Sequence, residues 1–314
     1  MLAGLTALQI AVLLAAGVLL DYLLGETPRW HPLVGFGNLA ARVEHYLNRG
    51  RWRFLRGVLG WTMAVAPLTL LAAVLGGAGG LAAHALMLYL ALGLRSLGEH
   101  NLPIAQALLA GDLAQARLLT ARIVSRDTAH ADAADLAKAS AESLLENGND
   151  AVFGTLFWFA VGGGPGAVLF RLANTLDAMW GYRNARFERF GCAAARIDDA
   201  LNFIPARMTA FSYVVLADDR PRAWRCWRVQ APAWPSPNAG PVMASGAGAL
   251  GLALGGVATY GGIVETRPPL GEGRAAGPHD IERAWSLVQK SAMLWLGVAA
   301  GAALIVTLLE RAHA

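Results

Sequence analysis

Long uncharged stretches alternate with short arginine-rich ones along this chain. The stretches that carry no Asp, Glu, Lys or Arg include Met1 to Leu20, Gly57 to Leu94, Ala151 to Phe170 and Ser291 to Leu309. An α-helix needs roughly 20 apolar residues to cross the hydrocarbon core of a bilayer. The pattern predicts an all-α fold, a polytopic membrane helical bundle that forms a single domain over 1–314. Its transmembrane candidates are 2–20, 57–75, 80–97 and 291–309.

Glycine clusters interrupt two of these stretches. The sequence "GGAGG" at Gly76 to Gly80 predicts a tight helical hairpin. The sequence "GGGPG" at Gly162 to Gly166 leaves about ten apolar residues before it, too few for a crossing. Irregular backbone at membrane depth is tolerated where it lines a cavity. We therefore expect a broken or re-entrant helix near 151–172, made of two half-helices.

The longest polar stretch lies between the hairpin and the broken helix. From Leu97 to Asp150, apolar residues recur at helical intervals, and Gly111 predicts a break. Asp127 and Thr128 are expected to cap the helix that follows, because their side chains accept hydrogen bonds from free backbone N–H groups. We expect polar helices and loops on the cytoplasmic side here.

The last third of the chain contains a run of small residues. The sequence "ASGAGALGLALGG" predicts a closely packed helix over 241–262. The following segment, Val264 to Asp280, is expected to be a loop.

Composition supports the membrane interpretation. Of 314 residues, 55% are hydrophobic and 15% charged, whereas about 25% are charged in soluble domains. The mean hydropathy is +0.42. The net charge of +4 comes mostly from arginines scattered among carboxylates, which argues against nucleic acid as a partner. The two cysteines are too few and too far apart for a disulfide framework.

Four polar clusters stand out in this apolar chain. They are "SRDT" (Ser125 to Thr128), "ESLLENGND" (Glu142 to Asp150), "NTLDAMWGY" (Asn174 to Tyr182) and "ARIDDALNFIPAR" (Ala195 to Arg207). Each has a plain structural explanation, such as a helix cap or a solvated helix face. In the second cluster, however, Glu142, Glu146 and Asp150 are four residues apart and share one face of a predicted helix. That helix leads directly into membrane-embedded sequence, where carboxylates need a partner.

The residue types in these clusters favour one kind of chemistry. Carboxylate and amide oxygens suit Mg²⁺, which proteins usually hold with one or two carboxylates plus substrate phosphates. Guanidinium groups suit phosphate. His31, in "RWHP", is a candidate base, although a histidine near a membrane interface is more often only interfacial. No Walker A loop or GxGxxG motif is present, and "GGGPG" lacks the P-loop lysine.

Six segments together resemble the adenosylcobinamide-phosphate synthase family of cobalamin biosynthesis. They are "DYLLGETPRWHPLVGFGNL", "SRDT", "ESLLENGNDAVFGTLFW", "ANTLDAMWGYRN", "FGCAAARIDDALNFIPARM" and "SPNAGPVMASGAGALG". They occur in the family's order and cover nearly the whole chain. The spacing of "RWHP" after "GETP" is a mild departure, in a part of the family where this spacing varies.

The resemblance implies a multi-pass enzyme of the cell inner membrane with its active site facing the cytoplasm. The implied substrates are adenosylcobyric acid and aminopropanol or its phosphate, which ATP and Mg²⁺ help to join by an amide bond. Membrane lipid is the expected surrounding. A homo-oligomer, or assembly with other membrane proteins of the cobalamin pathway, stays open.

The resemblance also implies roles for individual residues. Candidate catalytic residues are Glu142, Glu146, Asp177, Asp198 and Asp199, and candidate metal ligands are Glu146, Asp150, Asp198 and Asp199. Candidate substrate- or phosphate-binding residues are His31, Ser125, Arg126, Asp127, Thr128, Asn147, Asn174, Tyr182, Arg196, Asn202, Arg207, Ser236 and Asn238. All of them are expected to converge in one pocket.

Two other functions compete with this one. A non-catalytic membrane sensor or regulator on the same scaffold is the main alternative, but such a protein need not keep the ionisable clusters. A transporter is the third, since broken helices and intramembrane charge are transporter features. Against it, most of the charge lies in predicted interfacial loops, and no paired inverted halves are visible.

Overall fold

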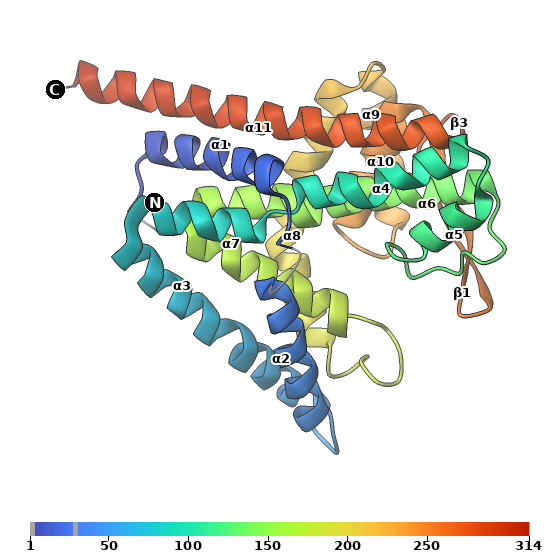
Figure 1. Ribbon diagram of the computed structural model, residues 1–314, viewed down its shortest axis with the longest axis horizontal. Coiled ribbons are helices and arrows are strands. Elements are labelled where there is room, and N and C mark those ends of the chain that lie inside the picture. Colours follow the sequence, from blue (N-terminus) through green and yellow to red (C-terminus); the bar gives the residue numbers. More distant parts are fainter. Residues whose placement is uncertain (1–3, 28–30, 314) are drawn as a thin grey trace. The chain divides into compact units, whose positions relative to one another are not determined.

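The structure, a computed structural model, describes residues 4–27 and 31–313 and is predominantly helical (Figure 1). The start of the predicted span 2–20, the residues Pro28 to Trp30 of the "RWHP" segment, and Ala314 lie outside the described residues. The helices are α1 (Ala7–Leu24), α2 (Pro32–Leu47), α3 (Arg53–Ala91), α4 (Leu94–Leu109), α5 (Leu113–Thr120), α6 (Ala133–Gly148), the π-helix η1 (Asn149–Phe153), α7 (Gly154–Trp180), α8 (Cys192–Leu216), α9 (Arg220–Gln230), the 3₁₀-helix η2 (Ala231–Ala233), α10 (Ala239–Leu250) and α11 (Pro278–Ala312). The predicted all-α, polytopic membrane class is confirmed.

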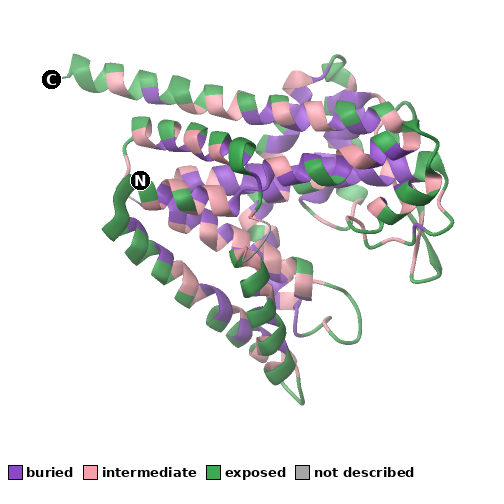
Figure 2. Cartoon of the chain, viewed as in Figure 1, coloured by how far each residue is buried: buried purple, intermediate pink, exposed green. Residues whose placement is uncertain are grey.

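Within the described residues, four helical stretches are long and apolar enough to cross a membrane. They are Ala7–Leu24, Arg53–Leu109, Ala133–Trp180 and Pro278–Ala312. Aliphatic side chains on them are left exposed, as for Val74 at 68% on α3. In Figure 2 the first half of α3 and the end of α11 are coloured mostly as exposed. These faces are suited to contact with lipid, because hydrocarbon chains solvate aliphatic side chains.

The chain forms two compact units, where the sequence favours a single domain. Unit 1 consists of Met1–Gly93, Asp150–Asn202 and Leu296–Ala314. Unit 2 consists of Leu94–Asn149 and Phe203–Trp295. Helices α8 and α11 each contribute residues to both units.

In unit 1, α3 is two helices joined at Gly80, as the "GGAGG" sequence predicts. Gly80 has φ 57° and ψ −145°, far from helical angles, and only glycine adopts this region without strain. Gly76 allows the two halves to approach, because a Cβ there would lie 3.2 Å from the ring of His84. The hairpin therefore depends on Gly80 for the backbone angles of the turn and on Gly76 for close packing of the two halves.

The predicted break in α7 is also confirmed. Gly163 has φ 61° and ψ −153°, so the chain forms two half-helices on either side of it. The restart leaves a backbone N–H without a helical partner. The N–H of Gly164 instead donates to Nδ1 of buried His84, at 2.8 Å. The turn in α3 and the break in α7 thus stabilise each other.

The core of unit 1 lies where α2, α3, α7 and α8 meet. Its buried residues are Phe36, Ala40, Ala64, Val65, Leu172, Leu176, Trp180, Phe190 and Ala194. A Cβ on Gly57 would lie 2.0 Å from the carbonyl oxygen of Phe190. Close approach of α3 to the segment before α8 therefore requires glycine at this position.

Unit 2 contains a small sheet that the sequence prediction missed. Helix α10 ends at Leu250, and residues predicted as helix up to 262 form strand β1 (Leu252–Tyr260) instead. The predicted loop contains β2 (Ile263–Leu270) and β3 (Arg274–Ala275), in the sheet order β2-β1-β3. The helical prediction was wrong after Leu250 because Gly251 adopts φ 67° and ψ 42°, a left-handed helix cap.

The caps around the first polar cluster also differ from the prediction. The break at Gly111, with φ 74°, separates α4 from α5 as expected. Helix α6 begins at Ala133, however, and its N-cap is Asp132, which accepts from the N–H of Asp135 at 2.8 Å. The prediction that Asp127 and Thr128 cap this helix was therefore wrong. The chain remains irregular for several residues beyond them, and their side chains have other partners.

Candidate functional site

Asp198 is the centre of a buried polar cluster in unit 1. It lies on the first part of α8 with only 7% of its surface exposed. Its Oδ2 accepts from Nδ2 of Asn202 at 3.1 Å, one helical turn away. Its Oδ1 accepts from Nδ2 of Asn174 on α7 at 3.3 Å. The structure thus brings together one side chain each from the third and fourth sequence clusters.

Burial and neighbouring carboxylates both raise the pKa of Asp198. Burial raises the pKa of Asp198 well above its usual value, and the negative charges of Asp150 and Asp177 raise it further, against the two amide hydrogen bonds that lower it. Repulsion of this kind is relieved by a proton or by a cation. The electrostatics of the cluster therefore favour binding of either a proton or a cation.

Asp199, the next residue, lies in a more open and more basic environment. Burial raises its pKa, while the nearby charges of Arg196 and Arg183 lower it. Arg196 is exposed, so its guanidinium is accessible to a phosphate. Adjacent aspartates on one helix turn thus differ: Asp198 is enclosed by amides, and Asp199 lies beside arginines.

A second cluster lies in unit 2, around Arg126 and Glu142. Arg126 Nη2 donates to Glu142 Oε2, and the two side chains are only 13% and 7% exposed. Glu142 Oε1 also accepts from the N–H of Gly255 on β1, at 2.7 Å. Burial has the largest effect on the pKa of Arg126 and lowers it. The negative charges of Glu142 and Glu146 raise it, and the resulting pKa lies above the usual arginine value.

The acidic face predicted on one helix is therefore divided between two surroundings. Glu142 and Glu146 belong to α6 and to the Arg126 cluster. Asp150 lies in the π-helical turn η1, where the helical register changes, and its charge acts on Asp198. The predicted single pocket would join residues of both units and stays a prediction.

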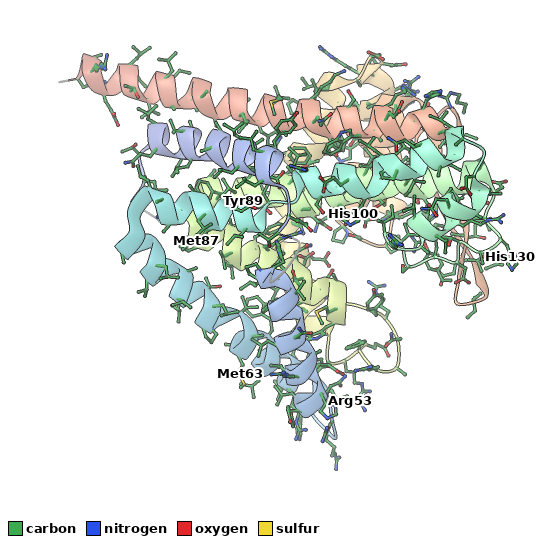
Figure 3. All side chains as sticks on the ribbon, in the orientation of Figure 1. Arg53, Met63, Met87, Tyr89, His100 and His130 are labelled. Atoms are coloured by element: carbon green, nitrogen blue, oxygen red, sulfur yellow. The ribbon has the colours of Figure 1, made fainter. Side chains whose placement is uncertain are left out.

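The hairpin of β1 and β2 is tied to the "SRDT" segment. The N–H of Asp127 donates to the carbonyl of Thr259 at 2.8 Å, and Asp127 Oδ2 accepts from the N–H of Gly262 at 2.7 Å. Lys138 Nζ donates to the carbonyl of Val257 at 3.4 Å. Beside these contacts is a cavity of about 400 Å³ that Arg126, Lys138 and His130 border. Figure 3 labels His130.

A third cluster joins α8 to the loop before α10, also within unit 2. Arg207 Nη1 donates to Asn238 Oδ1 at 2.9 Å, and its Nη2 donates to the carbonyl of Pro237 at 3.1 Å. Ser236 Oγ accepts from the N–H of Ala239 at 3.1 Å and thereby fixes the start of α10. Arg207 also lies over the ring of Phe203. The "PAR" and "SPNAG" motifs are thus direct neighbours.

Other predicted site residues have local roles or lie at the surface. His31 Nδ1 accepts from the N–H of Leu33 at 3.2 Å and caps α2. Thr128 is buried and donates to the carbonyl of Arg117 at 3.0 Å. Asn147 donates to Ser143 at 3.0 Å. Ser125 and Tyr182 are exposed, as are Asp127, Asn147 and Arg196.

Among the described residues, no group of three or more His, Cys, Asp or Glu side chains is arranged to hold a metal ion. The oxygen-rich cluster around Asp198 nevertheless matches the ligand preference of Mg²⁺. That ion takes one or two carboxylates and fills its other positions with water and phosphate oxygens. The residue types fit such an ion.

Two residues that contact the clusters were not predicted from the sequence. Gly255 contributes a backbone N–H and Lys138 an ammonium group. Lys138 was recognisable as one of two lysines in the chain. The role of Gly255 depends on a strand that was predicted as helix, so no sequence signal pointed to it.

The fold and these clusters define a class: a polytopic, helical membrane protein with buried acid–amide and acid–guanidinium clusters. The profile of the CobD/Cbib protein family matches residues 14–288. The chain belongs to the CobD/Cbib family, which confirms the resemblance read from the six motifs.

Individual relatives agree with this assignment. Cobalamin biosynthesis protein CobD of Stutzerimonas stutzeri is 60% identical over 284 residues, which cover 89% of this chain and 93% of the relative. The protein of the same name from Chromobacterium violaceum is 52% identical, covering 94% and 97%. The one from Mycobacterium tuberculosis is 40% identical, covering 87% and 90%. No solved structure gives a significant match. Family membership supports a role in cobalamin biosynthesis.

Proposed function

We propose that this protein is an amide ligase of cobalamin biosynthesis. It joins (R)-1-aminopropan-2-ol O-phosphate, or aminopropanol itself, to a propionate of adenosylcobyric acid at the expense of ATP. The product with the phosphorylated donor is adenosylcobinamide phosphate. The observation that carries the proposal is the enclosed Asp198, bound by two amides and surrounded by further carboxylates. A buried ionisable carboxyl group in a membrane protein is costly and is expected mainly at functional sites. Magnesium-dependent phosphate chemistry uses carboxylates of this kind as metal ligands.

The reaction needs an activated carboxyl group, because a carboxylate is a poor acylating agent. A propionate oxygen of the corrinoid attacks the γ-phosphorus of ATP, and ADP leaves. The amine nitrogen then attacks the acyl carbon, inorganic phosphate leaves, and the amine loses a proton to a base. Each step develops negative charge on phosphate oxygens, so catalysis consists mainly of positioning and charge stabilisation.

The clusters supply groups for each task. Asp198 and Asp199, with Asp150 and Glu146 as further candidates, would hold Mg²⁺, which when bound neutralises phosphate charge. Asp177 and Glu142 are candidates for the base that takes the amine proton. The three arginines Arg126, Arg196 and Arg207 would bind phosphate groups bidentately. The asparagines Asn147, Asn174, Asn202 and Asn238 would orient substrate or metal-bound water. Ser125, Asp127, Thr128, Tyr182 and Ser236 are the remaining candidates for substrate contact.

Purified protein in detergent tests this function directly. Adenosylcobyric acid, ATP and Mg²⁺ are supplied with each amine donor in turn, and the corrinoid product and ADP are measured. We expect one ADP per amide bond formed, with Asp198→Ala and Asp199→Ala each lowering turnover by about 100-fold or more. Asp218→Ala, at an exposed acid in the turn before α9, is the matched control and should retain full activity.

Two results would end the proposal. Wild-type turnover in the Asp198→Ala, Asp199→Ala double variant would remove these residues from catalysis. Corrinoid binding without any product from either donor would favour the sensor or regulator instead. We place the enzyme in the cell inner membrane, with its site on the cytoplasmic side, where ATP is available.

A further inference from the structure

Unit 1 contains an almost entirely apolar cavity of about 430 Å³ that the proposed reaction does not use. It lies among α2, both halves of α3, and the second half of α7. Figure 3 labels Met87, one of its lining residues on the second half of α3. The described lining residues are Pro32, Leu33, Gly35, Phe36, Leu39, Leu68, Leu71, Ala72, Leu75, Met87, Leu90, Ala91, Val168, Arg171 and Leu172.

Arg171 is the one charged side chain among these described lining residues. Its Nη1 has two hydrogen bonds, to the carbonyl of Asp150 and to Oδ1 of Asn174, each at the long distance of 3.5 Å. Its Nε is shielded from solvent and has no partner. The carboxylates of Asp150 and Glu26 attract it from a distance. In the described part of the chain, no carboxylate forms a salt bridge with it.

This arrangement leaves a cation poorly compensated. A guanidinium has five N–H donors, and two long bonds to neutral oxygens satisfy few of them. A charge in membrane-embedded surroundings is costly unless it is paired with an opposite charge or reaches water. Gly93 is a close neighbour of the group, since a Cβ there would lie 3.5 Å from Arg171 Nη2. The surroundings of Arg171 therefore favour binding of an anion beside its guanidinium group.

The cavity walls are suited to a hydrocarbon chain. The lining residues on α3 run from Leu68 to Leu75 in its first half and from Met87 to Ala91 in its second half. At 1.5 Å per residue these two stretches span roughly 10 Å and 6 Å, enough to contact several methylene groups of an acyl chain. Leu71, at 52% exposed, opens the cavity to the outside of the helical bundle.

We propose that this cavity binds an anionic phospholipid. Its phosphate contacts the Arg171 guanidinium, and one acyl chain lies between the two halves of α3. Charge complementarity selects an anionic over a zwitterionic headgroup, because a choline cation would repel Arg171. The apolar walls select a lipid over a soluble phosphate. The inference does not rest on the proposed ligase activity, and binding is measured without any substrate.

Native mass spectrometry of the purified protein tests it. The protein is incubated with equal amounts of phosphatidylglycerol and phosphatidylcholine of the same chain length. We expect at least about tenfold preferential retention of phosphatidylglycerol, which corresponds to one charge-assisted hydrogen bond. Arg171→Gln should abolish the preference, and Arg171→Lys should keep much of it. Arg42→Gln, at an exposed arginine of α2 outside the cavity, should behave as the wild type.

A second variant keeps the test valid if Arg171→Gln does not fold. Leu71→Trp leaves the charge in place but fills the cavity mouth, and it should lower retention of both lipids. Equal retention of the two lipids by the wild type would overturn the proposal, and so would undiminished retention of phosphatidylglycerol by Leu71→Trp. Displacement of phosphatidylglycerol by millimolar glycerol 3-phosphate would overturn it too, since Arg171 would then serve a soluble phosphate.

Discussion

At the scale of single residues, Asp198 shows how a fold alters an acid. Its raised pKa means that the folded protein binds this proton more tightly than the unfolded chain. The free energy of unfolding therefore falls as pH rises from the usual aspartate pKa, near 4, through the raised value. Asp198→Asn removes the ionisable group and keeps the shape of the side chain.

We predict that this substitution raises the melting temperature relative to the wild type, and that the gain grows as pH rises above about 4, the usual aspartate pKa. Thermal unfolding in detergent without divalent ions measures the effect. Asp218→Asn, at an exposed aspartate, should show no such trend. A gain of the same size at every pH would contradict the assignment.

Arg126 and Glu142 form the other informative pair at this scale, because both partners are nearly buried. Removing one charge leaves the other without compensation, so we predict that Glu142→Gln lowers the free energy of unfolding by about 3–5 kcal/mol. Glu272→Gln breaks the pair between Arg225 and Glu272, whose side chains are 54% and 44% exposed, and should lower the free energy of unfolding far less, because solvent screens an exposed pair.

Chemical denaturation of each variant measures both values. The double variant Arg126→Leu, Glu142→Leu should be more stable than Glu142→Gln alone, because it leaves no buried charge unpaired. Similar losses for Glu142→Gln and Glu272→Gln would show that burial adds nothing to the first pair.

At the scale of elements, the break in α7 depends on one glycine. Gly163 has a backbone conformation that is essentially confined to glycine, and its neighbour Gly162 is helical with open space around its Cβ position. We predict that Gly163→Ala lowers the free energy of unfolding by about 1–3 kcal/mol. Gly162→Ala should be neutral or stabilising by up to about 1 kcal/mol.

Unfolding of the two variants under the same conditions compares a strained site with a matched helical one. Equal effects would mean that the two half-helices do not require the angles of Gly163. The same logic applies to Gly80 in α3, where Gly77 provides the helical control with open space.

Elements also show where sequence reasoning fails. The membrane helices and their breaks were predictable, because absent charge, glycine clusters and Pro165 act locally on the backbone. Strand β1 was not, since its sequence "LALGGVATY" lacks alternation of polar and apolar residues. The pairing of Glu142 with Gly255 depends on this strand. Local sequence patterns therefore predicted the membrane helices but missed strand β1, whose Gly255 contacts Glu142 in the candidate site.

At the scale of the whole molecule, the arrangement in the membrane can be tested. The arginine-rich loops are predicted to lie on the cytoplasmic side, and the uncharged α3 turn on the outer side. In a background of Cys192→Ser and Cys226→Ala, single cysteines replace Ser125, Ala185 or Ala78. We predict that membrane-impermeant maleimide labels Ala78→Cys in intact cells, and labels the other two only in inverted vesicles.

Labelling of Ala185→Cys in intact cells would contradict the prediction for its loop, and labelling of Ser125→Cys would contradict it for the "SRDT" segment.

The overall class was predictable because hydropathy alone determines it. The candidate site was predictable in part: residue types indicated polar side chains that would need partners, and Asn174 and Asp198 are in contact. The distribution of such side chains over clusters depends on contacts between segments far apart in the sequence, such as Arg207 with Asn238.

The discontinuous build of unit 1 has a consequence for biogenesis. Its last segment, Leu296–Ala314, leaves the ribosome only after all of unit 2 has been synthesised. A nascent chain that has inserted α1, α3 and α7 must therefore wait, with one helix still missing, while the remaining sequence is translated. Unit 1 therefore cannot complete its fold until all of unit 2 has been translated, and premature termination before Leu296 leaves unit 1 without its last segment.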